Sequence, residues 1–258
     1  MKKETSFPHG RESKEIINTW IAASEGMTAR KKPGLMWPSK AFFYLILIFV
    51  LCPENLSAQA LIDLNFEGDE VGKFPSGWSS RDKENMIKTY TVQAEEGNKF
   101  LHADSRGTSV QIGCEKKWEL KDFPILRWRW RAQTFPERTN EREKSGNDNV
   151  LAVYVVFGGW PIPSSIKYVW SDTLPVGATF DSPHSGRTKI IVVRNGRSMT
   201  GRWVTEERNV LADYRSLFGE GEKNPAAKGI ALLTDSDNTN TRAVGDYGEI
   251  TILAKGGR

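Results

Sequence analysis

The segment from Asp235 to Thr241, Asp-Ser-Asp-Asn-Thr-Asn-Thr, is a markedly polar run directly after an apolar stretch. Asp235 and Asp237 are two residues apart, so an extended backbone places both carboxylates on one face, about 6–7 Å apart. Paired carboxylates at this spacing suit acid–base catalysis or the oxygen ligands of calcium. A solvated turn whose side chains cap their own backbone is the alternative interpretation.

An EF-hand template counted from Asp235 gives a weak match. It places oxygen ligands at Asp237 and Thr239, but Asn240 stands where glycine is required. Asp246 replaces the glutamate expected at the twelfth position, and strands rather than helices are expected on both sides. The acid–base pair, the cation loop and the solvated turn therefore all remain open.

Two further carboxylates are candidates for acid–base chemistry. Glu206 and Glu207 are adjacent, and adjacent residues of a strand face opposite ways, so at most one of them can serve a site. We take Glu206 as that candidate. Asp148 is the second, because it lies two residues before an apolar strand at 150–157.

The segment LRWRWRA at 126–132 alternates strictly between apolar and basic residues. Trp128 and Trp130 are expected to face the core, which places three arginines on the opposite face. Guanidinium groups bind carboxylates or phosphates bidentately, or they pair with acidic residues of neighbouring strands. We expect this arginine row and the Asp235/Asp237 pair to converge on one functional face. The arginines are Arg127, Arg129 and Arg131.

The elements that position these residues are mostly strands. About ten short strands alternate with turn signals, and the apolar run 150–157 is typical of a central strand, with 166–170 returning antiparallel to it. Residues 209–218 predict one helix, with Asn209 as its N-cap. The pattern predicts an all-β antiparallel sandwich, jelly-roll-like, with one short helix.

The first 60 residues predict a leader with a cleavable signal peptide. An apolar run of 12 residues at 41–52 follows a basic cluster and precedes Ala58-Gln59-Ala60, which suits cleavage after Ala60. The run is shorter than the ~20 residues that span a bilayer, so we expect no transmembrane anchor after processing. Met27 is an alternative start. The expected product is one periplasmic or secreted domain, 61–258.

Charge and cysteine content restrict the function classes. Residues 1–60 hold eight Lys/Arg and five Asp/Glu, which leaves 28 and 27 in residues 61–258. A nearly neutral domain is a poor match for nucleic acid. Cys114 is the single cysteine of this domain, so no internal disulfide can form. His102 and His184 have no partners at metal-ligand spacing.

From Phe66 to Ile252 the chain resembles an exported bacterial family known as a domain of unknown function, DUF 3047. The resemblance is carried in order by LRWRWR, by Asp148 with VYVVF, and by YVWSD, ERNVLADY, FG and LLTDSDNT. The family name implies no activity. The same segments supply further residues that we expect to bind a ligand: Tyr168, Trp170, Arg208, Asn209, Asp213 and Asn238.

A looser resemblance links FEGDEVGKFPSGW near the start of the domain and DYGEITIL near its end to jelly-roll carbohydrate-binding modules. In those modules, acidic residues near both chain ends often hold a structural calcium. The resemblance implies such a site here at Glu67, Asp69 and Asp246. Trp160, Trp170 and Trp203 can stack on sugar rings or fill the core.

These observations support three hypotheses. The domain is a binding module for a glycan or another anionic envelope ligand, a hydrolase or lyase that uses Asp235 and Asp237, or a structural accessory protein. A groove with two carboxylates about 5–10 Å apart would favour the enzyme. A flat tryptophan platform without them would favour binding.

Overall fold

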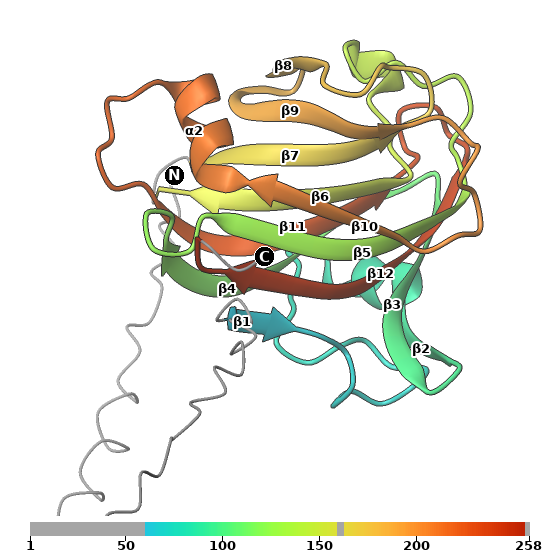
Figure 1. Cartoon of the computed structure of the whole chain (residues 1–258). Coiled ribbons are helices and arrows are strands. Elements are labelled where there is room, and N and C mark those ends of the chain that lie inside the picture. The colour runs from blue at the N-terminus through green and yellow to red at the C-terminus, as the bar shows by residue number, and fades with distance from the viewer. Residues whose placement is uncertain (1–59, 159–162, 256–258) are drawn as a thin grey trace, which may run out of the picture. The chain divides into compact units, whose positions relative to one another are not determined.

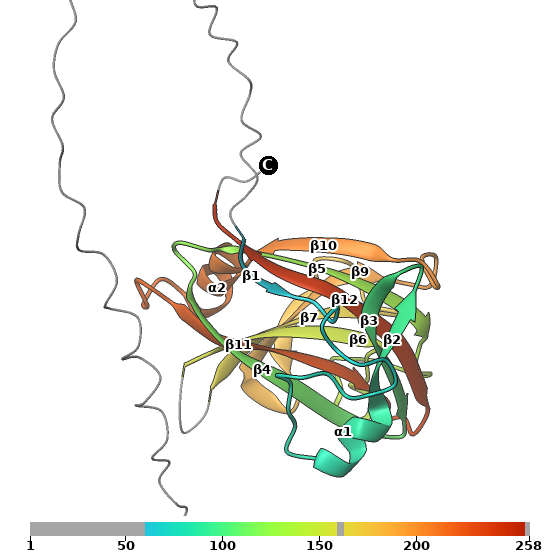
Figure 2. The same ribbon diagram turned by 90° about the horizontal axis from the view of Figure 1, so that it is seen from below.

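Two layers of β-sheet form the domain in the computed structural model, which describes residues 60–158 and 163–255. Figure 1 shows both layers from one side, and Figure 2 shows them from below. The described residues all lie in one compact unit, Pro53–Arg258. The predicted leader and Trp160 lie outside the described residues, so the structure does not bear on them.

Sheet A has six strands. Its order is β10-β5-β12-β3-β2, and β1 pairs with β12 beside this path. Every pairing in the sheet is antiparallel. The strands are β1 Ala60–Leu64, β2 Tyr90–Glu95, β3 Asn98–Arg106, β5 Ile125–Thr134, β10 Val204–Asn209 and β12 Arg242–Leu253.

Sheet B also has six strands, in the order β4-β11-β6-β7-β9-β8. Strands β6 and β7 are antiparallel, as the sequence predicted, whereas β7 and β9 run parallel. The parallel pair is possible because β8 and its connections carry the chain back before β9 begins. The strands are β4 Ser109–Glu119, β6 Leu151–Phe157, β7 Ser164–Ser171, β8 Thr179–Ser182, β9 Ser185–Asn195 and β11 Ala226–Asp235.

Aromatic side chains fill the space between the sheets. Trp128 and Trp130 of β5 point inward and are fully buried, as their alternation with arginine predicted. The Trp128 ring lies 5.4 Å from that of Tyr168, and the Trp130 ring lies 5.9 Å from that of Trp170. Such contacts join the two sheets and stabilise the sandwich through buried apolar area.

Two α-helices and one 3-10 turn lie outside the sheets. The predicted helix is α2, Val210–Phe218, and the Asn209 side chain accepts a hydrogen bond from the backbone N–H of Ala212, as an N-cap does. The sequence prediction missed α1, Lys83–Thr89, which Asp82 caps and which packs beside β2, β3 and β4. The 3-10 turn is Lys144–Gly146.

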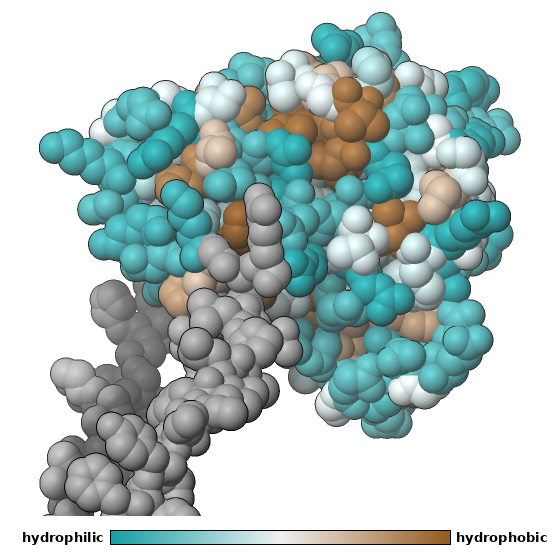
Figure 3. Space-filling model, viewed as in Figure 1, coloured by the Kyte–Doolittle hydropathy of each residue, from teal (hydrophilic) through white to brown (hydrophobic). Residues whose placement is uncertain are grey.

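The face seen in Figure 3 is largely hydrophilic, with an apolar area over β7 and β9. Among the described residues, no helix has the length and apolar character that crossing a membrane requires. The two stacked sheets confirm the predicted all-β, jelly-roll-like sandwich, which has two short α-helices where the sequence predicted one.

Candidate functional site

A polar hollow of 360 Å³ lies on the outer face of sheet B. Strands β4, β11, β6 and β7 supply its floor, and the β8–β9 turn and the loop after β11 supply its walls. We call it the acidic groove. It is lined by Ser109, Gln111, Asn147, Tyr154, Lys167, Ser182, His184, Ser185, Thr188, Leu233, Asp235, Asp237 and Asn238.

Tyr154 and Lys167 form a buried pair in the floor. They are opposite each other on β6 and β7, and the Lys167 Nζ lies 5.5 Å from the centre of the Tyr154 ring. Lys167 is 2% exposed. Burial lowers its pKa, but Tyr154 and Asp235 raise it by more, so the net shift is upward and the lysine stays charged.

Asp235 is the last residue of β11 and faces the groove from the floor. Its side chain is 4% exposed, and one carboxylate oxygen accepts a hydrogen bond of 2.6 Å from the backbone N–H of Asn149. Burial raises the pKa of Asp235 to about 7, although the Lys167 charge and the Asn149 N–H oppose the shift. Asp235 therefore exchanges a proton near neutral pH.

Asp148 fixes the loop that follows Asp235. It is fully buried, and its two oxygens accept hydrogen bonds from the backbone N–H groups of Asn238 and Thr239, at 3.1 and 2.8 Å. The Thr239 hydroxyl adds a third, at 2.6 Å. These bonds hold Asp237 beside Asp235, so Asp148 acts as a clamp on the loop.

Asp237 is exposed at the rim, and one carboxylate oxygen from each of Asp148, Asp235 and Asp237 lies within 4.8 Å of the others. Two kinds of chemistry fit this arrangement. A buried carboxyl group beside an exposed one suits proton transfer to and from a ligand. Three hard oxygen donors also suit a divalent cation, so these residues would hold one if it bound.

Sequence reasoning placed Asp235, Asp237, Asp148 and Asn238 among candidate residues, and the structure brings these four together. It missed Tyr154 and Lys167. The signal for Lys167 was its position in the otherwise apolar segment IKYVW. A lysine at a buried strand position needs compensating groups, and here Tyr154 and, after it, Asp235 favour its charged form.

The arginine row does not converge with Asp235 and Asp237. It lies on the outer face of sheet A, whereas the aspartates belong to sheet B, so the expected common face was wrong. Each arginine has an acidic partner within sheet A. Arg127 contacts Glu207 at 2.7 Å, Arg129 contacts Glu249 at 3.4 Å, and Arg131 contacts Glu95 and Asp246, both at 2.7 Å.

Glu206 is also absent from the groove. As expected for adjacent strand residues, it faces away from Glu207, toward the edge of the core. There its carboxylate accepts hydrogen bonds from Arg194, at 2.5 Å, and from the Trp130 indole N–H, at 3.4 Å. The candidate catalytic role of Glu206 does not fit this paired, largely buried position.

Most residues expected to bind a ligand around α2 are structural instead. Tyr168 and Trp170 are 0% exposed between the sheets, so a surface ligand cannot reach them. The Tyr168 hydroxyl donates to Asp213 at 2.8 Å, and Arg208 donates twice to the same carboxylate. Together with the Asn209 cap, this network fastens α2 to both sheets.

The predicted metal residues are not gathered into one site. Asp246 is fully buried and accepts hydrogen bonds from His102, Arg131 and Gln133, which occupy its oxygens. Glu67 accepts from the Lys99 N–H, and Asp69 accepts from Ser76. Within the described residues, the acidic group close enough for a shared ion is that of the acidic groove.

The fold is similar to solved carbohydrate-active proteins at very low sequence identity. The carbohydrate-binding module TmCBM61, solved with β-1,4-galactotriose, is 12% identical, with 74% of this chain and 99% of that one covered and a TM-score of 0.34. Trichoderma harzianum endoglucanase 3 of family GH12 is 10% identical, covering 75% and 97%, with a TM-score of 0.39.

The xyloglucanase domain of NopAA from Sinorhizobium fredii is 8% identical, covering 76% and 100%, with a TM-score of 0.38. No curated protein matches the chain in sequence. At these scores the likeness describes the general architecture, and no residue role is transferred from it.

A family model described as protein of unknown function (DUF3047) matches residues 76–251. This range is more than half of the chain, and it contains the LRWRWR strand, Asp148 and the LLTDSDNT segment that form the scaffold and the groove described above. The chain belongs to the DUF3047 family of proteins of unknown function.

Proposed function

We propose that the domain binds a glycan chain in the acidic groove and cleaves a glycosidic bond there, with Asp235 as the acid and Asp237 as the nucleophile. The observation that carries this proposal is the meeting of these two carboxyl groups, one buried and one exposed, in an open groove. The predicted leader agrees with a substrate in the cell envelope or outside the cell.

The groove has room for a chain rather than a single small molecule. Two further hollows, of 590 and 570 Å³, adjoin it on the same face, and all three share Gln111 as a lining residue. Together they follow the outer face of sheet B from the β8–β9 turn to β4. A continuous open surface of this kind suits an extended polymer.

The lining suits a neutral polyhydroxylated ligand. It offers hydroxyl groups, side-chain amides and an imidazole, and Tyr154 contributes an aromatic ring to the floor. Such groups donate and accept the many hydrogen bonds that sugar hydroxyls require. The carboxylates disfavour an anionic ligand at this point, since Lys167 is already engaged by Asp235.

The two aspartates fit the roles of acid and nucleophile. With its pKa at about 7, Asp235 retains a proton that it can donate to the leaving oxygen. Asp237 is exposed on the groove side and can attack the anomeric carbon as its bond to the leaving oxygen breaks, which forms a glycosyl ester. A water molecule then hydrolyses this ester, and the deprotonated Asp235 takes the proton of that water. Retaining glycosidases place these two groups roughly 5–5.5 Å apart. Here one oxygen of each group lies within 4.8 Å of the other, so the pair is on the close side of that range.

The test is a screen for new reducing ends on neutral polysaccharides with the purified chain. Asp235→Asn and Asp237→Asn should each lower turnover by at least about a hundredfold, because each removes one partner of the reaction. The matched control is Asp122→Asn, an exposed aspartate in the β4–β5 turn, which should keep wild-type activity. Activity that survives in both groove variants would refute the assignment.

The pH profile is a second test. Turnover should fall above pH about 7, since Asp235 then loses the proton that it donates. If turnover occurs and its falling limb lies well above this pH, another group is the acid.

Binding without cleavage is the second candidate. The burial of Asp235 favours it, because only 4% of this residue is exposed and a bound glycan can contact little of the carboxyl group that would donate the proton. Calorimetric titration with neutral oligosaccharides separates the two. A pure binding module would bind without releasing reducing ends, and Gln111→Ala would weaken that binding.

A further inference from the structure

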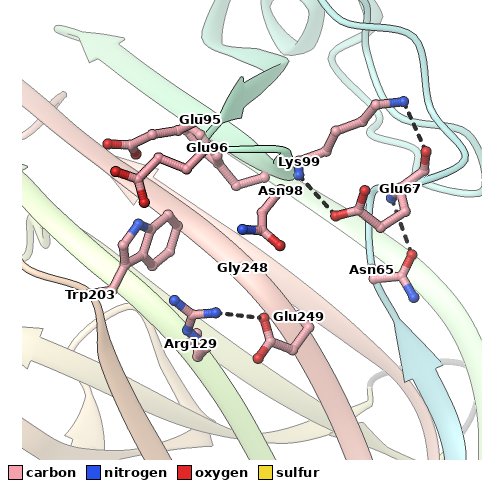
Figure 4. Close-up of a pocket in the computed structure, with 11 residues that line it drawn as sticks. Asn65, Glu67, Glu95, Glu96, Asn98, Lys99, Arg129, Trp203, Gly248 and Glu249 are labelled. Carbon is pink, nitrogen blue, oxygen red and sulfur yellow. Dashed lines mark hydrogen bonds and ion pairs between the residues drawn. The ribbon is translucent and has the colours of Figure 1, made fainter.

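Another hollow lies on the outer face of sheet A, the opposite side of the sandwich from the acidic groove. Its volume is 140 Å³, and Figure 4 shows the residues that line it. They come from the β2–β3 turn and the start of β3, the segment after β1, strands β5 and β12, and the loop before β10. We call it the Trp203 pocket.

Trp203 forms one wall of this pocket and is held by its neighbours. Its ring centre lies 5.2 Å from the guanidinium of Arg129, 4.7 Å from that of Arg131, and 5.4 Å from the Phe100 ring. Gly248 makes this position possible. A Cβ there would lie 3.1 Å from the Arg129 Cβ, which is tight, and 3.4 Å from the Trp203 ring, so a larger side chain would press on Arg129 first.

Several polar groups around Trp203 retain unused hydrogen-bonding capacity. Arg129 has five N–H donors, yet its one ion pair, to Glu249, is long at 3.4 Å. Within the described residues, the side chains of Glu96 and Asn98 have no hydrogen bond or ion pair. In Figure 4 these groups surround the space beside the indole.

The backbone at Glu96 points to the same conclusion. Glu96 has φ of 51° and Gly97 has φ of 83°, so both central residues of the β2–β3 turn are left-handed. Such turns favour Asn, Asp or Gly at the first position, and a glutamate there costs roughly 1 kcal/mol. A ligand contact made by the Glu96 carboxylate would account for a residue that the turn itself disfavours.

The charge of the pocket restricts the ligand. Four glutamates line it against Arg129 and Lys99, so an anion is repelled. A cation that stacks on Trp203 would be repelled by the two positively charged guanidinium groups already beside the ring. An uncharged ligand with several hydroxyl groups meets neither obstacle, and its C–H face can pack against the indole.

We propose that the Trp203 pocket binds a single neutral sugar residue, packed against Trp203 and hydrogen-bonded by Arg129, Glu96 and Asn98. This site is separate from the acidic groove and does not depend on cleavage there. Its volume fits one ring, so it would hold a glycan end or branch while the groove holds a chain.

The experiment is a titration of the full chain with methyl β-D-glucoside, methyl β-D-galactoside and methyl α-D-mannoside, followed by the NMR signal of the Trp203 indole N–H. Comparison with Trp203→Phe assigns the signal. At least one neutral glycoside should shift it saturably at millimolar concentration, whereas methyl β-D-glucuronide should not.

Glu96→Asn and Arg129→Gln should each weaken this binding by about tenfold or more. Glu96→Asn should leave the melting temperature unchanged or raised, because Asn suits the turn. Glu84→Gln, an exposed control on α1, and Asp237→Asn, in the groove, should change the affinity by less than about twofold.

The proposal is overturned if no neutral glycoside shifts the signal, if Glu96→Asn and Arg129→Gln bind as wild type, or if Asp237→Asn abolishes the shift.

Discussion

The outer faces of the two sheets carry the same kinds of charged side chain in different arrangements. On sheet A, acids and bases alternate across neighbouring strands, so Arg127 is opposite Glu207 and Arg131 is opposite Asp246. On sheet B, three aspartates gather at the end of β11, with Lys167 as the nearby buried cation. Most arginines of the first face are paired with acidic residues, whereas the three aspartates of the second face are like charges placed together.

This difference separates paired charges from unpaired ones. Where strand register places opposite charges together, each charge stabilises its neighbour and little capacity remains for a ligand at those paired residues. On sheet A a ligand therefore has to use the incompletely paired groups of the Trp203 pocket. Where a loop and a strand end bring like charges together, their repulsion and burial destabilise the folded state unless a proton, an ion or a ligand is present. The comparison predicts how substitutions on the two faces differ.

The largest effect is expected for Asp246→Ala on sheet A. Asp246 is fully buried and accepts hydrogen bonds from His102, Arg131 and Gln133. Its removal leaves those groups without their common acceptor, which should lower the free energy of unfolding by about 3–5 kcal/mol. Urea unfolding measures this loss. A change below about 1 kcal/mol would show that the network is not structural.

Asp235→Asn should raise the free energy of unfolding, the opposite of the effect of Asp246→Ala, and the size of the gain should depend on pH. Between pH about 4 and 7, folded Asp235 keeps a proton that the unfolded chain releases, so wild-type stability falls as pH rises. The shift of about three pKa units corresponds to roughly 4 kcal/mol at most. The variant, which cannot ionise, should match wild type near pH 4 and exceed it at pH 8.

Thermal or urea unfolding of both proteins across this pH range checks the prediction. Asp122→Asn serves again as the exposed control and should show no such divergence. Wild type and Asp235→Asn that remain parallel from pH 4 to 8 would mean that Asp235 is ionised throughout, held by Lys167.

Asp148→Ala should have an intermediate effect concentrated in one loop. It removes the acceptor for the N–H groups of Asn238 and Thr239, which typically costs about 1–3 kcal/mol. Hydrogen exchange should become faster in residues 236–241 and stay unchanged in the core of β11. Asp148→Asn, which keeps one acceptor oxygen, should lie between the two proteins. Uniform destabilisation without faster loop exchange would contradict the clamp role.

Local spacing was enough to predict the faces of individual strands. The alternation in LRWRWRA placed Trp128 and Trp130 inside and the arginines outside, because successive strand residues point to opposite faces. Asp235 and Asp237 were also expected to be close, but their oxygens lie within 4.8 Å rather than the 6–7 Å of an extended backbone, because β11 ends at Asp235. The helix at 210–218 followed from the Asn209 cap and the apolar spacing. In each case the information lies within a few residues.

Long-range pairing was not predictable from spacing. Asp148 contacts Asn238 and Thr239 across about 90 residues, and no local pattern specifies that contact. The arginine row and the Asp235 strand were expected to be neighbours, but they lie in different sheets, since partner choice depends on the packing of the whole core. Lys167 was missed because the groups that stabilise its charge, Tyr154 and Asp235, lie on other strands, and Asp235 is 68 residues distant in sequence.

The smallest effect is expected for Arg127→Ala. Its pair with Glu207 is short, at 2.7 Å, but both side chains are about half exposed, so water screens the attraction and competes for both groups. Exposed pairs of this kind typically contribute ~0.2–1 kcal/mol, and the variant should lose no more than that. Urea unfolding at low and high salt measures this loss, and salt should reduce the difference between the variant and wild type further.

Comparison with Arg131→Ala, whose guanidinium contacts buried Asp246, keeps the strand and the residue type constant. If both variants lose the same stability, burial does not distinguish the paired charges of sheet A.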